Sequence, residues 1–323
     1  MERFLLVFGV FTLVSCGSSG GKGINGNKMD ENSGDGGTSP VNSLVISEEN
    51  MLQVARTVFR SADRVSGYVT DYLFTPYYYY SSEPEYSGDG FTLACADGGN
   101  VLHKGNIVDG DNPFRSKGDK LESRFSECYE NDETISGSET FEILEYRYHM
   151  DSQSNVSPQS EHYRFIHSAF EIVKSDSEVV LGFDGTIDLY ESTNDTKDLD
   201  NMRLELNNLE LIEAGSKVFY KNYAIESEFD RPNQIESTSY TGTIETSMLQ
   251  GSFSVVTNEL LTIKFTSRPS YEYQSGSFSV EGASESKLWV DVVDDNNVLL
   301  RLDVDGDLEI DFEGEFNSGR VGL

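Results

Sequence analysis

The chain has 323 residues, with 56 Asp and Glu against 24 Lys and Arg, so its formal net charge is -32 and its pI is near 4.3. This surplus of negative charge excludes a nucleic-acid-binding protein that works through a basic surface. Hydrophobic residues make up 37% of the chain and aromatic residues 11%, enough for a sizeable core, which excludes a disordered acidic tail.

The N-terminus has the pattern of an export signal. An apolar run from Phe4 to Val14 follows Met1-Glu2-Arg3. The run is too short to cross a bilayer as a helix but has the length of a signal-peptide core. We therefore expect residues 1–15 to be a signal peptide.

The run ends in Leu13-Val14-Ser15-Cys16, which resembles the lipobox of bacterial lipoproteins. The resemblance implies cleavage before Cys16, a diacylglycerol on its thiol and acylation of the new amino terminus. Several acyl chains, at about 0.8 kcal/mol per buried methylene, would make the anchor permanent. A plain secretory signal with a chance cysteine is the alternative.

The expected second residue of the mature chain is Gly17 rather than the Asp that is usual in similar lipoproteins kept at the inner membrane. The resemblance therefore implies a protein anchored in the outer membrane. Residues 16–43 are rich in Gly, Ser and Asn, a composition that buries too little apolar surface to fold. We expect a flexible tether there and a globular domain over residues 44–323.

The two remaining cysteines, Cys95 and Cys128, are expected to form a disulfide. They are an even pair in a chain that leaves the reducing cytosol. Closing this loop of about 33 residues would contribute about 3 to 4 kcal/mol. A reactive or metal-binding thiol is the alternative, but the acidic neighbours would make it less reactive.

One amphipathic helix is expected at the start of the domain. Ser47 is its expected N-cap and Gly67 its expected stop, and apolar residues recur between them at helical spacing, from Met51 to Val65. We expect the apolar stripe to pack on a sheet. Arg56, Arg60 and Arg64 form a cationic row on the other side.

Beyond the helix, apolar residues alternate with polar ones, which is typical of strands with one wet face. No helix-length segment separates these strands, so antiparallel pairing is expected. The predicted class is mainly β: a large curved antiparallel sheet, as a half-barrel or sandwich-like meander, with one N-terminal helix. The predicted strands include residues 141–148, 163–173, 179–190, 202–212, 218–229, 240–246, 261–265, 288–292, 298–304 and 308–312.

Short glycine motifs recur along the strands. GSFSV occurs at Gly251 and again at Gly276, and FDGTIDL from Phe183 is similar to YTGTIET from Tyr240. We expect these glycines at bulges, turns or bends of one curved sheet. The polar stretch 151–160 is the best candidate for a division into two lobes.

The acidic segment near the C-terminus is the one candidate metal site. Its alternating carboxylates resemble those of EF-hand-like calcium loops, but Leu308 and Gly314 stand where such loops need Gly and a bidentate Glu. We favour a hairpin turning at Asp305-Gly306, with weak calcium binding as the minority alternative and no other cofactor. The candidate ligands are Asp303, Asp305, Asp307, Glu309 and Asp311.

Aromatic residues suggest one candidate glycan site. The four tyrosines Tyr77, Tyr78, Tyr79 and Tyr80 could stack on a sugar ring, although packing in the fold explains them equally well. The single tryptophan, Trp289, lies in an alternating strand and is expected in the core.

No catalytic residue is predicted. His162 and His167 are five apart in a strand and should face opposite sides, which suits joint metal binding poorly. We find no nucleophile elbow, zinc-protease helix or phosphate loop. A glycan hydrolase would need two convergent carboxylates with perturbed pKa values, and we expect no such pair.

The stretches around Cys95, Gly118-Asp119 and Cys128, with the Asp-rich hairpin, loosely resemble β-rich lipoproteins of Gram-negative bacteria. That resemblance implies no activity. Our hypothesis is a non-enzymatic protein anchored in the outer membrane by lipid, presenting a β-sheet binding or structural surface to an envelope protein or glycan. The alternatives are a half-barrel carrier of apolar ligands and, third, a glycan hydrolase.

Overall fold

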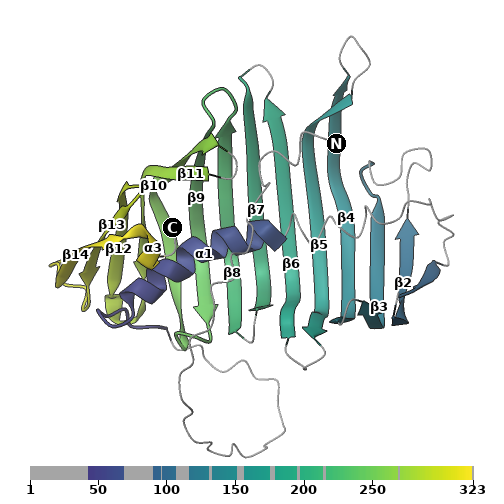
Figure 1. The fold of residues 1–323 in the computed structure, drawn as a ribbon, viewed down its shortest axis with the longest axis horizontal. Coiled ribbons are helices and arrows are strands. Elements are labelled where there is room, and N and C mark those ends of the chain that lie inside the picture. The colour runs from purple at the N-terminus through teal and green to yellow at the C-terminus, as the bar shows by residue number, and fades with distance from the viewer. Residues whose placement is uncertain are drawn as a thin grey trace, which may run out of the picture.

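The computed structural model describes residues 43–68, 90–95, 97–106, 116–130, 133–150, 156–174, 179–194, 197–213, 216–267 and 270–321. These residues form a single antiparallel sheet of 14 strands in which every strand pairs with its neighbours in the sequence. The sheet is open (Figure 1), since β1 and β14 lie at its two ends. The predicted class, a mainly β curved meander with one N-terminal helix, is confirmed.

The longest strands are β4 and β5, which pair with each other along their lengths. The polar stretch 151–160 therefore lies between two paired strands of one sheet, and its residues 156–160 belong to β5. The strands are β1 (Phe91–Ala94), β2 (Gly98–Asn106), β3 (Lys120–Glu130), β4 (Glu133–Met150), β5 (Val156–Lys174), β6 (Val179–Asn194), β7 (Leu199–Glu213), β8 (Ser216–Asp230), β9 (Ile235–Thr246), β10 (Gly251–Ser267), β11 (Ser270–Glu281), β12 (Lys287–Asp294), β13 (Asn297–Asp303) and β14 (Phe312–Asn317).

Helix α1 (Met51–Tyr68) crosses one face of the sheet over its C-terminal half, from the side of β12 to about β7 (Figure 1). Its apolar side chains are buried against that face, with Val54, Ala55 and Val58 fully covered. The ring of Phe59 packs edge-on against Tyr273 and Phe278, at centroid distances of 6.3 and 5.1 Å. The predicted packing of the helix on a sheet is confirmed, and we call this side of the sheet the core face.

The ends of α1 differ from the prediction. The helix begins at Met51, whose N–H donates to the carbonyl oxygen of Ser47, and it is the side chain of Asn50 that accepts from the Ser47 N–H. The helix ends at Tyr68, one residue beyond the predicted stop at Gly67. None of the described helices is long and apolar enough to cross a membrane.

A row of β-bulges runs across the sheet. At each bulge a glycine has a positive φ, and a backbone carbonyl of a neighbouring strand occupies the place where a Cβ would lie. Bulges bend a strand and increase its twist, so a continuous row curves the whole sheet. The pairs are Gly99 with Glu127, Gly137 with Ala169, Gly185 with Asn208, Gly242 with Asn222, and Gly276 with Leu260.

Three of the four glycines in the repeated motifs, Gly185, Gly242 and Gly276, belong to this row, which confirms their expected role. The fourth, Gly251, begins β10 after a turn.

Two predictions about the C-terminal strands are wrong. Trp289 points away from the core face, because its neighbours Leu288 and Val290 are the fully buried residues of β12. Leu308 and Ile310 belong to a loop and are 81% and 44% exposed. The predicted strand over 308–312 is absent from the described residues except for Phe312, which begins β14.

Candidate functional site

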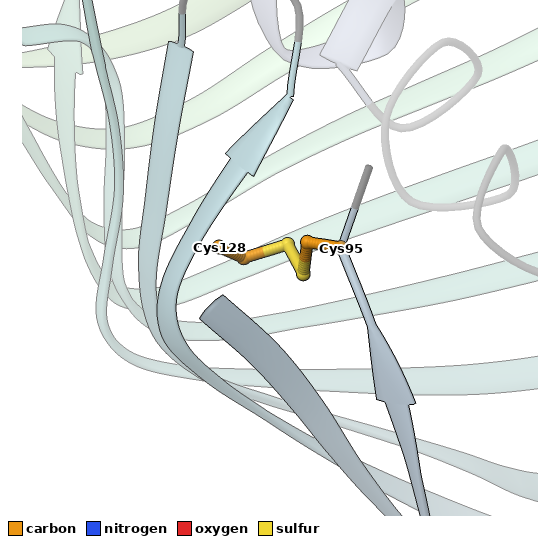
Figure 2. Close-up of a disulfide and its surroundings, with 2 residues drawn as sticks. All are labelled: Cys95 and Cys128. Atoms are coloured by element: carbon orange, nitrogen blue, oxygen red, sulfur yellow. A yellow bond between two sulfur atoms is a disulfide. The ribbon is translucent and has the colours of Figure 1, made fainter. Parts of the chain in front are cut away.

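The predicted disulfide between Cys95 and Cys128 is confirmed (Figure 2). Cys95 directly follows the short strand β1, and Cys128 lies on β3, with 5.4 Å between their Cα atoms. Both cysteines are buried and pack with Val101. The bond therefore ties the four-residue strand at one end of the sheet to the sheet interior.

Two groups of predicted site residues lie outside the described residues. These are the lipidation site Cys16 and the tyrosine block Tyr77–Tyr80.

The acidic segment forms the loop between β13 and β14, so the predicted hairpin is present with a longer turn than expected. Ligand atoms of Asp303, Asp305 and Asp311 lie within 4.8 Å of one another. Each of these carboxylates also accepts backbone N–H groups of the loop itself. Asp303, 1% exposed, accepts from Gly306 at 2.7 Å and from Leu308 at 3.0 Å. The loop therefore uses much of its carboxylate capacity to hold its own conformation.

The helix-free face, opposite α1, carries Trp289, which is partly buried. The Lys287 ammonium lies 5.4 Å from the centre of the indole ring and 2.8 Å from Oε1 of Glu281. Three apolar side chains of the same face are about half exposed, namely Val256 and Leu260 on β10 and Val293 on β12. In this part of the face an aromatic ring and apolar side chains are mixed with paired charges.

A second group on the helix-free face is an ion-pair ladder over β5 to β8. Arg164 binds both oxygens of Asp188, at 2.8 and 3.3 Å, and His162 Nε2 lies 3.0 Å from Oδ1 of the same carboxylate. The rings of His162 and Tyr190 stack at 3.9 Å. Arg203 then bridges Glu205 of its own strand and Glu226 of β8.

The core face holds a row of polar residues that was not predicted from the sequence. His103, Ser123, Glu139 and His167 are direct cross-strand neighbours on β2 to β5, and none is more than 5% exposed. His103 Nδ1 lies 2.9 Å from Ser123 Oγ, and His167 Nε2 lies 3.3 Å from Glu139 Oε2. Burial lowers the pKa of His103 to about 4, although the Glu139 carboxylate acts in the opposite direction. His103 is therefore neutral at pH 7.

His162 and His167 do lie on opposite faces of β5, as predicted. His162 pairs with Asp188 on the helix-free face, whereas His167 packs between Phe170 and Phe183 on the core face.

One carboxyl group with a raised pKa lies next to a second carboxylate. Glu161 on β5 is the direct cross-strand neighbour of Glu191 on β6. Burial, followed by the negative charges of Glu161 and Asp200, raises the pKa of Glu191 to about 8. This pair can hold a proton at neutral pH.

Comparison with protein-family models, with curated proteins and with solved structures finds no match for this chain. The described residues therefore define this protein by its fold alone. They form an open antiparallel meander of 14 strands, crossed on one face by a helix.

Proposed function

We propose that this chain is a non-enzymatic protein, anchored in the outer membrane by lipid on Cys16, whose helix-free sheet face is a binding surface. The observation that carries the proposal is the position of Trp289 on that face. Tryptophan is enriched in binding interfaces because it buries a large area and retains a polar N–H. The partly buried indole group lies on the same face as half-exposed Val256, Leu260 and Val293, and apolar surface of this kind is favourable to cover.

A binding role requires one face of the sheet to be accessible, and the two faces differ in this respect. The core face is occupied by α1 and the apolar residues beneath it. The helix-free face carries aromatic rings, apolar side chains and paired charges without a described element over it. The disulfide supports the expected place, since disulfides persist in oxidising compartments such as the bacterial periplasm.

The anchor is tested by growth with a palmitate analogue. We expect label on the wild-type chain and none on Cys16→Ser. The binding face is tested in the same cells by placing a photo-crosslinking amino acid at position 289 and, as a control, at the exposed Asn233 in the turn between β8 and β9. We expect a defined cross-linked product from position 289 alone, which disappears when Cys16→Ser misplaces the protein. Equal products from both positions would contradict the proposal.

The carrier alternative is not favoured. An apolar ligand under the helix would need a cavity there, but the described part of α1 is in direct contact with the sheet through Phe59 and its buried neighbours.

The hydrolase alternative gains one specific observation, the Glu161 and Glu191 pair. A raised pKa suits a general acid, and hydrolases that use two carboxylates need one acid and one base. The test is hydrolysis of envelope glycans by the purified protein and by Glu191→Gln. We expect no activity from either protein, and activity abolished by the substitution would replace the binding role by catalysis.

A further inference from the structure

β14 is the last strand of the sheet, and in the described residues it pairs with β13 alone. Figure 1 shows it at the extreme end of the sheet, next to the short helix α3 (Ser318–Val321). An antiparallel strand turns half of its backbone N–H and C=O groups to each side, so β14 has a row of these groups directed away from β13. Such an edge is a template for a further strand.

The two faces of β14 carry different side chains. Glu313 and Glu315 are exposed and lie on the helix-free face, where their cross-strand neighbours are Arg301 and Leu299. Phe312 and Phe316 lie on the core face, with ring centroids 6.2 Å apart, and pack against the apolar core. The edge therefore has two glutamates on one face and two phenylalanines, with Gly314 between them, on the other.

The end of β14 is held by contacts with its surroundings. The Ser318 N–H donates to the carbonyl oxygen of Asn296 at 2.7 Å, and the Asn317 side chain donates to the same oxygen at 3.2 Å. The Arg320 guanidinium lies 5.4 Å from the ring centre of Phe316. An edge fixed in advance loses little conformational entropy when a partner strand adds to it.

We infer that β14 is the docking edge for an extended, cationic segment of another protein, which adds to the sheet as a further strand. The inference rests on the proposed binding role and specifies its partner. Main-chain hydrogen bonds give affinity in this mode of recognition, and alternate side chains give specificity. The complementary segment has Lys or Arg at alternate positions, facing Glu313 and Glu315, and apolar residues between them, facing Phe312 and Phe316.

Charge decides between this partner and a second copy of the chain. The chain has a net charge of -32, which attracts a cationic segment and speeds its association. Pairing of β14 with β14 of another copy would bring glutamates of the two strands together on one face. Like charges directly opposite each other destabilise a sheet, so the same two residues that favour a basic partner disfavour self-association.

The test uses the full chain, purified in detergent, and two synthetic peptides of identical composition. One peptide of about eight residues alternates lysine and valine, and the other has the lysines and the valines in two blocks. Both have the same charge, but only the first can present lysines to one face of a strand and valines to the other. Binding is measured by calorimetry, and its place by hydrogen exchange of the backbone amides of residues 312–317.

We expect the alternating peptide to bind and to slow exchange in β14 by about tenfold or more, and the block peptide to do neither. The double variant Glu313→Gln/Glu315→Gln should weaken binding about tenfold. The control variant Asp184→Asn/Glu228→Gln removes two exposed carboxylates from β6 and β8, away from the edge, and should change the affinity for the peptide less than twofold.

Equal binding of both peptides, or protection outside β14, would overturn the inference, because the attraction would then be electrostatic alone. Failure of both peptides to bind would also overturn it. Neither result touches the proposed binding role, which the palmitate label on Cys16 and the crosslink from position 289 decide separately.

Discussion

Gly185 on β6 faces the backbone carbonyl of Asn208 on β7 so closely that a side chain at position 185 would collide with it. Gly185 has a φ of +128°, and Asn208 itself has a φ of +52°. The collision is with backbone rather than with a flexible side chain, so no rotamer change can relieve it. The bulge thus depends on the absence of a Cβ at this position.

We expect Gly185→Ala to lower the free energy of unfolding by about 2 kcal/mol or more, through backbone strain and displacement of β7. Gly182→Ala on the same strand is the matched control. Gly182 lacks a positive φ, and its nearest neighbours are side-chain atoms of Ile212 at 3.3 Å. Urea unfolding compares the two, and an equal loss in both variants would contradict the role of the bulge row.

The repeated glycine motifs were visible in the sequence because strand alternation continues on both sides of Gly185 and Gly242. The full length of the row was not visible, since Gly99 lies in a sequence that does not resemble those motifs and Gly137 shares with them only the hydroxyl residue that follows it. β1 to β3 were not predicted as strands either. Their apolar residues are few and their side chains on the core face are partly polar, so the alternation is weak.

The polar row on the core face shows why the site was harder to predict than the fold. Its members come from four strands, and only the register brings them together. One signal was available, because Glu139 alternates in phase with Phe141 and Ile143, and His167 with Phe165. The error on Trp289 has the opposite cause. Strand alternation fixes which residues share a face, and Leu288 and Val290 place Trp289 on the opposite face. The prediction followed the aromatic character of the side chain instead of this alternation.

Burial of His103 should make the protein less stable in mild acid. Its pKa in the folded state is about 4, below the value of 6.5 in an unfolded chain, so the unfolded state takes up a proton first. The stability present above pH 6.5 is lost as the pH falls toward 4, by up to about 3 kcal/mol. His103→Gln keeps a polar side chain without titrating there. Its unfolding free energy should change less between pH 7 and pH 4.5, and an unchanged slope would contradict the assignment.

Glu191 should have the opposite effect at higher pH. Its pKa is raised from the ordinary value of 4.5, expected in an unfolded chain, to about 8, so the folded state holds a proton that the unfolded state has released. The stabilisation from the protonated form is complete below pH 4.5 and is lost as the pH rises through 8, at a cost of a few kcal/mol. Glu191→Gln mimics the protonated side chain. It should be more stable than the wild type at pH 8.5 and similar to it at pH 4.5, as measured by thermal unfolding at both values.

The acidic loop should be stabilised by its own hydrogen bonds rather than by a metal ion. Asp303 accepts two backbone N–H groups while almost completely buried, so Asp303→Ala should cost about 2 kcal/mol. Asp307→Ala is the control, since that carboxylate is exposed and accepts one such bond. We expect EDTA to leave Tm unchanged and added calcium to raise it by less than about 1 °C. A Tm that falls with EDTA and recovers with calcium would establish the calcium site instead.

The lipid anchor is the central claim, and intact mass spectrometry of the protein extracted from membranes tests it most directly. We predict a chain that begins at Cys16 and carries the mass of a diacylglycerol and an amide-linked acyl chain, with Cys95 and Cys128 oxidised. A chain that begins elsewhere, or that begins at Cys16 with a free thiol and a free amino group, would contradict the account.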